Sequence, residues 1–270
     1  MKNLLLRSLT GILYAGAVLV AIHYGLVSFL FLFGIFTLLG SYEMIRMLQQ
    51  QSFSIKTGMP AIALAISVFL IISLILANHL PFETLFFSIV AFGLIFILQL
   101  YSGNSAPAFR IAENILPTLY IAIPFSTAIF LLEKPNEIEG IFIYLFFITL
   151  WINDSMAYVT GMLFGKHRLF ERISPKKSWE GFFGGLVFSV ATGLTVGILT
   201  ESDNLFIWAG YSLVVSIFAT FGDLVESMFK RSFNIKDSGN ILPGHGGILD
   251  RLDGATLGLP AAAAYLYFFF

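Results

Sequence analysis

The chain of 270 residues contains no cysteine and only four histidines. The absence of thiols excludes disulfide bonds, thiolate catalysis and metal sites built from cysteine. Because imidazole groups are also few, a metal site in this chain would depend mainly on oxygen ligands. Oxygen ligands are the ones that hard cations such as Mg²⁺ prefer.

Charged residues are also scarce. Charged residues make up 11% of the chain, against roughly 25% in an average soluble domain. Hydrophobic residues make up 57%, and apolar runs of about 20 residues, long enough to cross a hydrocarbon core, recur along almost the whole length. We therefore predict an all-α, polytopic integral membrane protein. The many phenylalanines are interpreted as lipid-facing and packing surface, so no nucleic-acid partner is expected.

The breaks between apolar runs predict nine membrane-spanning helices. Their expected bounds are 9–25, 27–45, 58–77, 82–101, 115–132, 140–163, 181–200, 205–225 and 255–270. The basic, apolar start is interpreted as the first of these helices, because no convincing small-residue cleavage site follows it. No linker or repeat separates a soluble part. We predict one membrane domain over 1–270, with N-terminal spans in 1–139 and catalytic spans and loops in 140–270.

The placement of basic residues predicts the topology. Fourteen of the 15 lysines and arginines lie at the amino terminus or in every second loop, and only Lys134 lies on the opposite side. The positive-inside rule then places the amino terminus in the cytoplasm and the carboxy terminus outside. Two cytoplasmic segments, 164–180 and 226–254, hold nine of the 15 bases together with several acids and glycines. We expect the chemistry of the protein there.

Several acids lie where an apolar helix should not have them. Asp154 falls about ten residues before the cytoplasmic end of its span, roughly 15 Å into the membrane. An ionisable group at that depth is costly unless it faces a polar cavity or a partner, so it is either a site residue or a structural acid bonded to a neighbouring helix. Asp223, Glu226, Ser227 and Lys230 share one helical stripe at the end of the eighth span.

Asp250 and Asp253 stand three residues apart just before the last span, with Arg251 between them. If they open that helix, both carboxylates share a face near its positive end. Three glycines precede them and allow the backbone to approach a ligand and turn its N–H groups toward an anion. These glycines are Gly244, Gly246 and Gly247.

Carboxylates from several helix ends favour a hard cation, Mg²⁺ above all, which completes its coordination with water and phosphate oxygens. Neighbouring bases would neutralise a polyphosphate. They are Lys166, Lys176, Lys177, Lys230, Arg231, Lys236 and Arg251. The pattern predicts metal-assisted phosphoryl or nucleotidyl transfer at the cytoplasmic face. His245 could be a proton donor, a phosphate contact or a polar loop residue, and the basic run 164–178 could instead anchor anionic lipids.

Four short strings at fixed spacing resemble the signature of the phosphatidate cytidylyltransferases, also called CDP-diacylglycerol synthases. They are SMFKR (227–231), KDSG (236–239), LPGHGG (242–247) and DRLD (250–253). The segments 157–169 and 173–181 also resemble the cytoplasmic loop of that family. The specific match covers residues 151–254, while the earlier spans fit only by hydrophobicity and number.

The resemblance implies a Mg²⁺-dependent reaction of CTP with phosphatidate that gives CDP-diacylglycerol and pyrophosphate, at the cytoplasmic face of the inner cell membrane. It implies Asp223 and Asp250 as the metal-holding pair, with Asp253 and Asp154 as further candidates and a second ion left open. Lys230, Arg231 and Arg251 are expected to act with these acids in catalysis. The residues expected to bind substrate are Lys166, Lys176, Lys177, Ser178, Lys236, Asp237, Gly244, His245, Gly246 and Gly247.

Three alternatives stay open at this point. A CTP-dependent transferase or kinase could act on another lipid, such as a polyprenol or an ether-lipid phosphate. A cation or proton transporter could use Asp154 and Glu226 within the membrane. A structural membrane protein could carry the basic loops only to anchor lipids. A homodimer through the membrane helices is expected on base rates alone.

Overall fold

A computed structural model describes residues 2–49, 55–103, 105–135, 138–241 and 246–270 of the chain. Within these residues the regular structure is almost entirely helical, and a single two-stranded hairpin is the exception. Seven of the described helices are long and apolar enough to cross a membrane. The predicted class, an all-α polytopic membrane protein, is confirmed.

The helices follow the expected spans closely. Their bounds are α1 (Lys2–His23), α2 (Leu26–Leu48), α3 (Ile55–Leu76), η1 (Phe82–Thr84), α4 (Leu85–Leu100), α5 (Pro107–Pro117), η2 (Thr118–Ala122), α6 (Ile123–Ser126), α7 (Ala128–Glu133), α8 (Ile141–Phe164), α9 (Trp179–Leu199), α10 (Leu205–Ser232) and α11 (Leu249–Phe269). The hairpin strands are β1 (Arg168–Phe170) and β2 (Ser174–Ser178).

Two expected spans fall outside the seven helices that meet the length and hydropathy criteria. The apolar part of α1, Thr10–His23, is too short, and α11 is not among the seven although it is 21 residues long. The number nine therefore stays a prediction, as does the side of the membrane on which each end of the chain lies. The fifth span is a run of short helices, Pro107–Glu133, that includes the π-helical turn η2.

Backbone contacts divide the chain into two compact units, each described here by itself. Unit 1 comprises Met1–Glu133 and Asp237–Arg251, and unit 2 comprises Lys134–Lys236 and Leu252–Phe270. The division at residue 133 lies close to the expected boundary between 1–139 and 140–270. The assignment of the whole chain to one membrane domain stays a prediction.

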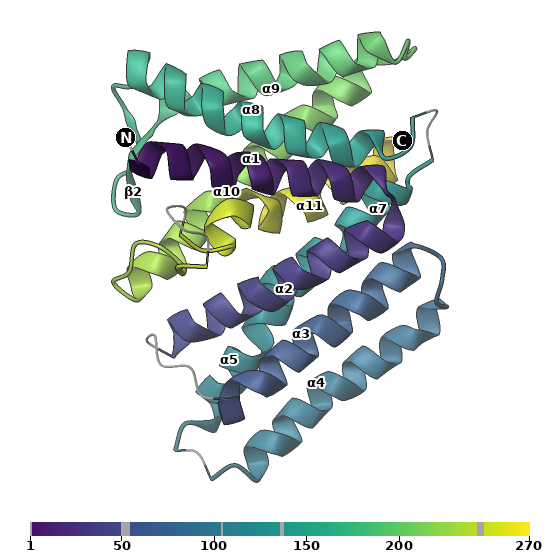
Figure 1. Ribbon diagram of the computed structural model, residues 1–270, viewed down its shortest axis with the longest axis vertical. Helices are drawn as coiled ribbons and strands as arrows, with labels where there is room; N and C mark the ends of the chain where they lie inside the picture. The colour runs from purple at the N-terminus through teal and green to yellow at the C-terminus, as the bar shows by residue number, and fades with distance from the viewer. Residues whose placement is uncertain (1, 50–54, 104, 136–137, 242–245) are drawn as a thin grey trace. The chain divides into compact units, whose positions relative to one another are not determined.

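In unit 1, helices α2, α3 and α4 lie side by side (Figure 1). Buried aromatic rings of α2 form part of the core of this unit. The rings of Phe29 and Phe33 stack with centroids 4.2 Å apart, and the ring of Phe125 packs edge-on against Phe33. Many apolar side chains of α4 are exposed, as expected for a surface that faces lipid. The same helix α2 carries a buried acid, Glu43, near its carboxyl end.

In unit 2, helices α8 and α9 lie side by side, and α9 also packs on α10 (Figure 1). Gly185 of α9 allows the close approach, because a Cβ there would lie 2.5 Å from Oδ1 of Asn153 on α8. Asn153 donates a hydrogen bond to the hydroxyl of Thr220 on α10 and accepts one from Ser216. This buried polar contact joins α8 to α10 directly beside Asp154.

Helices α10 and α11 of unit 2 meet at a pair of glycines. A Cβ on Gly222 would lie 2.5 Å from the carbonyl oxygen of Asp253 and 3.1 Å from Cα of Gly254. Small residues at such a crossing let two helix backbones come close together. Asp223 and Asp253 are the immediate neighbours of these two glycines, so the crossing brings both acids to one place.

We expect Gly222→Ala to lower the free energy of unfolding by about 1–3 kcal/mol, because the added methyl group meets backbone atoms that cannot move aside easily. Thermal unfolding of the purified protein in detergent measures the effect. Gly93→Ala is the matched control, since Gly93 lies in α4 with open space around the position of a Cβ. An equal loss of stability in both variants would contradict the close crossing.

Candidate active site

Unit 2 contains a cavity of about 470 Å³ whose walls come from α8, the β1–β2 hairpin, the start of α9 and the last turns of α10. Its acids are Asp154 and Asp223, and its bases are Arg168, Lys176 and Lys177. The remaining lining residues are polar or apolar: Asn153, Ala157, Tyr158, Gly161, Met162, Leu169, Pro175, Ser178, Gly181, Phe182 and Thr220. The cavity therefore combines both signs of charge with an apolar wall.

The hairpin is fixed to the start of α9 by two side chains. The carboxylate of Glu180 accepts hydrogen bonds from the backbone N–H groups of Lys166 and His167, and Nδ1 of His167 lies 2.7 Å from its Oε1. Ser178 is the N-cap of α9, and its hydroxyl accepts a hydrogen bond of 3.1 Å from the N–H of Gly181. The Glu180 contacts hold the start of the hairpin, and the Ser178 contact joins the end of β2, which carries Lys176 and Lys177, to α9.

Asp223 has two side-chain partners in the cavity wall. Its Oδ2 lies 2.6 Å from Nζ of Lys177, and its Oδ1 accepts a hydrogen bond of 3.2 Å from the hydroxyl of Ser227. Both side chains of the ion pair are only partly exposed, at 27% for Lys177 and 31% for Asp223. The hairpin thus supplies the cation that faces this acid, over a separation of 46 positions in the sequence.

Asp253 lies among other acids. The carboxylates of Asp223, Glu226 and Asp154 repel its carboxylate. In the described part of the chain, one hydrogen bond to its carboxylate is found, from the N–H of Gly254. Like charges gathered in this way are unfavourable unless a cation joins them.

Lys230 and Arg231 have specific partners at the carboxyl end of α10. Lys230 forms an ion pair with Glu226 one turn earlier, and the side chains of both are largely or completely buried. Arg231 donates hydrogen bonds to the carbonyl oxygens of Ile173 and Ile235, so it ties α10 to the hairpin and to the following turn. The catalytic role expected for these two bases stays a prediction.

The acids of unit 2 have a chemistry that suits a divalent cation. No three of the described histidines and acids lie close enough together to hold a metal ion by themselves. Mg²⁺ does not require such a group, because it is bound through one or two carboxylates together with water and substrate phosphates. Asp223 and Asp253 offer carboxylate oxygens, and Asp253 has further acids near it, so the two fit that requirement.

Asp250 lies in unit 1, where its carboxylate organises the glycine-rich loop. Its Oδ2 accepts hydrogen bonds from the backbone N–H groups of Ser238 and Gly247, at 2.9 and 2.8 Å, and from the Ser238 hydroxyl at 3.0 Å. Gly246 has a positive φ of 84°, which favours glycine. Gly244 and His245 lie outside the described residues, and the pairing of Asp250 with Asp223 stays a prediction.

The remaining expected site residues are mostly exposed in the structure. Lys166, Lys176, Lys236 and Asp237 have exposed side chains, and Arg251 is half-buried. Lys176 lines the cavity of unit 2, whereas Lys166 lies next to it and takes part through its backbone N–H. Their contacts with substrate stay predictions.

The sequence prediction missed three residues that shape these sites: Glu43, Asn153 and Glu180. Glu43 lies within an expected apolar span, and its charge alone was a signal of the same kind that singled out Asp154. Asn153 directly precedes Asp154. Glu180 offered no such signal, because an acid in the first turn of a helix is common on electrostatic grounds alone.

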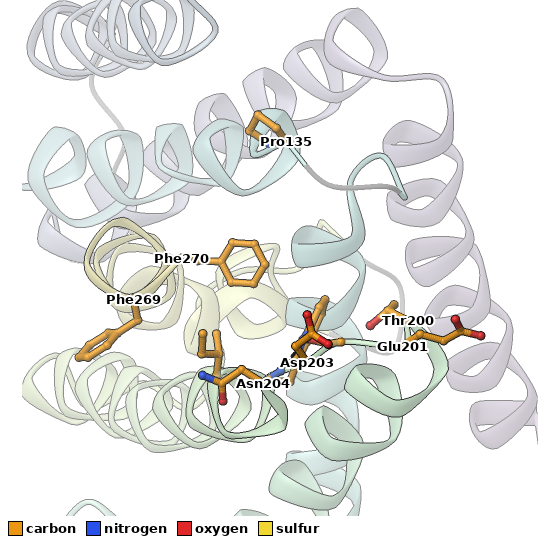
Figure 2. Close-up of a pocket in the computed structure, with 10 residues that line it drawn as sticks. Pro135, Thr200, Glu201, Asp203, Asn204, Phe269 and Phe270 are labelled. Carbon is orange, nitrogen blue, oxygen red and sulfur yellow. Dashed lines mark hydrogen bonds between the residues drawn. The ribbon is translucent and has the colours of Figure 1, made fainter.

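A second cavity, of about 500 Å³, lies at the other end of unit 2. Figure 2 shows Asp203 and Asn204 at the start of α10 and Phe269 and Phe270 at the end of α11 around it. Its charged lining residues are two exposed acids, Glu201 and Asp203. None of its described lining residues is basic, so these residues do not suit a phosphate-bearing ligand.

The fold and the first cavity define a polytopic membrane protein with acids and bases gathered at one end of a helical unit. Residues 5–269 match the sequence profile of the Cytidylyltransferase family. Because the match covers nearly the whole chain, the chain belongs to this family. The resemblance inferred from the four short strings is thereby confirmed.

Several similar proteins carry the name phosphatidate cytidylyltransferase. The one from Staphylococcus aureus (strain COL) is 41% identical over 169 residues, which are 61% of this chain and 64% of that protein. The one from Staphylococcus saprophyticus is 42% identical over 171 residues, with the same two shares. A Staphylococcus epidermidis protein (strain RP62A) is 48% identical over 124 residues, 45% of this chain and 48% of that protein. The matched part thus spans less than two thirds of each relative's length.

We expect Ser178→Ala to lower the free energy of unfolding by about 1 kcal/mol, because the first turn of α9 loses its side-chain cap. Ser178→Thr keeps the hydroxyl and should retain most of that stability. Thr192→Ala is the control, since the hydroxyl of Thr192 donates only to the Phe188 carbonyl within the same helix. Thermal unfolding in detergent compares the three variants, and a harmless Ser178→Ala would contradict the cap.

Proposed function

We propose that this protein is a Mg²⁺-dependent phosphatidate cytidylyltransferase that converts CTP and phosphatidate to CDP-diacylglycerol and pyrophosphate in phospholipid biosynthesis. Membership of the Cytidylyltransferase family and the names of the similar staphylococcal proteins support this reaction. The observation that carries it in the structure is the cavity of unit 2, where a group of acids, three bases and an apolar wall come together.

The acids provide the place for the metal. Asp223 and Asp253 would hold Mg²⁺, with Asp154, which lines the cavity, as a further ligand candidate. Asp250 precedes Asp253 by one turn of α11 and completes the set expected from the family resemblance. When bound, the divalent ion would offset the charge of the CTP phosphates and of the departing pyrophosphate. A second ion is compatible with the number of acids.

The bases provide the contacts to phosphate. Nζ of Lys177 lies 2.6 Å from Oδ2 of Asp223. Its ammonium group could therefore also contact a phosphate that binds beside this acid. Arg168 and Lys176 line the same cavity and add positive charge. These side chains would lessen the repulsion between CTP and phosphatidate, and would stabilise the charge that develops on pyrophosphate.

The reaction itself needs little acid or base catalysis. An oxygen of the phosphatidate phosphate forms a bond to the α-phosphorus of CTP, and the bond from that phosphorus to the β-phosphate oxygen breaks, so that pyrophosphate leaves. The attacking phosphate monoester is largely deprotonated near neutral pH. Orientation and charge stabilisation by the cavity are therefore the main contributions of the protein.

The position of the cavity suits one water-soluble and one lipid substrate. Its apolar lining residues Tyr158, Met162, Leu169 and Phe182 offer a surface for the glycerol and acyl part of phosphatidate. CTP is a cytosolic nucleotide, so we place the site at the cytoplasmic face of the cell membrane, in agreement with the positive-inside pattern. A homodimer in the membrane is part of this proposal on base rates only.

We expect Asp223→Asn to reduce the formation of CDP-diacylglycerol at least about a hundredfold, the scale of loss of one electrostatic contact to a reacting group. The measurement uses purified protein in detergent with labelled CTP, phosphatidate and Mg²⁺. Asp203→Asn, a change of the same kind at an exposed acid of unit 2, should stay within about twofold of wild type. Chelation of divalent metal should abolish the wild-type activity. Activity that survives both chelation and Asp223→Asn would refute this site.

A substrate screen separates the proposed reaction from its nearest alternative, a CTP-dependent enzyme that uses another lipid. Each nucleotide triphosphate is offered with phosphatidate, and CTP is offered with phosphatidate, a polyprenol, a polyprenyl phosphate and an ether-lipid phosphate. We expect turnover with CTP and phosphatidate together, with release of pyrophosphate. Turnover of CTP only with a polyprenol acceptor would replace this proposal with the kinase.

A further inference from the structure

The acid Glu43 on α2 holds the glycine-rich loop of unit 1. Its side chain is 1% exposed, although the helix around it is apolar. Oε1 accepts a hydrogen bond of 3.0 Å from the N–H of Ile248, and Oε2 accepts one of 3.0 Å from the N–H of Leu249. The carboxylate of α2 therefore satisfies two backbone donors at the start of α11, more than 200 positions away in the sequence.

Ser238 connects Glu43 to Asp250. The Ser238 hydroxyl lies 3.1 Å from Oε2 of Glu43 and 3.0 Å from Oδ2 of Asp250, so its single proton is available to either carboxylate. Asp250 also accepts from the N–H groups of Ser238 and Gly247. The two acids thus share one network of donors. Glu43 joins the loop to α2, and Asp250 joins the two ends of the loop at Ser238 and Gly247.

Two signature glycines are explained by the Glu43 carboxylate. A Cβ on Gly239 would lie 2.5 Å from Oε1 and 2.9 Å from Cδ of Glu43, and the three nearest atoms it would meet all belong to that side chain. A Cβ on Gly247 would collide with the Ser238 hydroxyl and with both carboxylate oxygens of Glu43. These positions therefore need glycine because the loop packs directly on the acid.

The site requires a carboxylate and not an amide. Each partner of Glu43 in the described residues of the loop is a donor: two backbone N–H groups and one hydroxyl. A glutamine would place its own NH₂ group against one of these donors and leave a buried N–H without an acceptor. The loss of one hydrogen bond between a buried donor and a charged acceptor is costly.

We propose that Glu43 is a positioning residue for the reaction: it anchors the signature loop at the start of α11 and thereby sets the position of Asp250. This inference rests on the proposed function for its catalytic consequence, but the anchoring itself does not depend on it. It also gives the N-terminal spans a role in holding the signature loop, since α2 supplies the anchor.

The first test is Glu43→Gln, with Glu83→Gln as the matched control because Glu83 is an exposed acid of the same unit. We expect Glu43→Gln to lower kcat with phosphatidate and CTP at least about tenfold, the change produced by one lost hydrogen bond to a charged group. The KM for phosphatidate should change much less, because the acid contacts the loop and not the cavity. Glu83→Gln should match wild type.

Hydrogen–deuterium exchange provides a readout that does not use activity. We expect the peptide containing Ile248 and Leu249 to exchange faster in Glu43→Gln than in wild type, while peptides of α8 and α9 are unchanged. Unchanged exchange at 248–249 together with kcat within twofold of wild type would overturn the proposal. If wild type itself lacks cytidylyltransferase activity, the proposed function fails, and the exchange result still decides whether Glu43 anchors the loop.

A double-mutant cycle tests the direct contact between Gly239 and Glu43 independently of the Glu43→Gln variant. Gly239→Ala alone should impair activity and thermal stability, because its methyl group meets the Glu43 side chain. In a Glu43→Ala background the space next to Gly239 is open, so adding Gly239→Ala should cause little further loss of activity or thermal stability. Gly239 has no positive φ, so backbone strain does not complicate the comparison. If the losses of the two single variants add up in the double variant, the direct contact is absent and the proposal is wrong.

Discussion

The structure depends on one constraint: a carboxylate cannot lie among apolar helices without a positive or hydrogen-bonding partner. Glu43 meets it with two backbone N–H groups and a hydroxyl. Asp223 meets it with Lys177 and Ser227, and Glu226 meets it with Lys230. Asp253 accepts a hydrogen bond from the N–H of Gly254 and is repelled by the three acids Asp223, Glu226 and Asp154. Under the proposed function a divalent cation would supply the positive partner at that position, and this would connect the packing of the helices to the proposed chemistry.

Close helix crossings determine where these charges lie. At Gly185 the backbone of α9 comes against Asn153, and at Gly222 the backbone of α10 comes against that of α11 beside Asp253. The acids beside these crossings are carried on helices and not on loops, so their separation is set by helix packing. The bases come from a different source: a hairpin held by Glu180 brings Lys177 to Asp223. Acids on helices that face bases on a short hairpin form an arrangement that suits the binding of a triphosphate and a monophosphate ester.

Much of the fold was predictable because hydropathy and loop charge are local properties of the sequence. The expected span 140–163 and helix α8 (Ile141–Phe164) differ by one residue at each end, and Asp154 was identified from its depth alone. The pairing of Lys177 with Asp223 was not predictable, because it depends on how the hairpin folds over α10. Glu43 was overlooked since it lies three residues before Arg46, where a helix approaching the membrane surface tolerates charge; its partners come from the far end of the chain.

The most direct test of the account is the binding of a divalent ion by these acids, measured without turnover. Mn²⁺ serves as a paramagnetic substitute for Mg²⁺, and its electron paramagnetic resonance signal reports the free ion during titration of the purified protein with CTP present. We expect saturable binding by wild type and by Asp203→Asn, and a loss of affinity of at least about tenfold in Asp223→Asn. Equal Mn²⁺ affinity in wild type and Asp223→Asn would contradict the claim that the acids of α10 and α11 hold the metal.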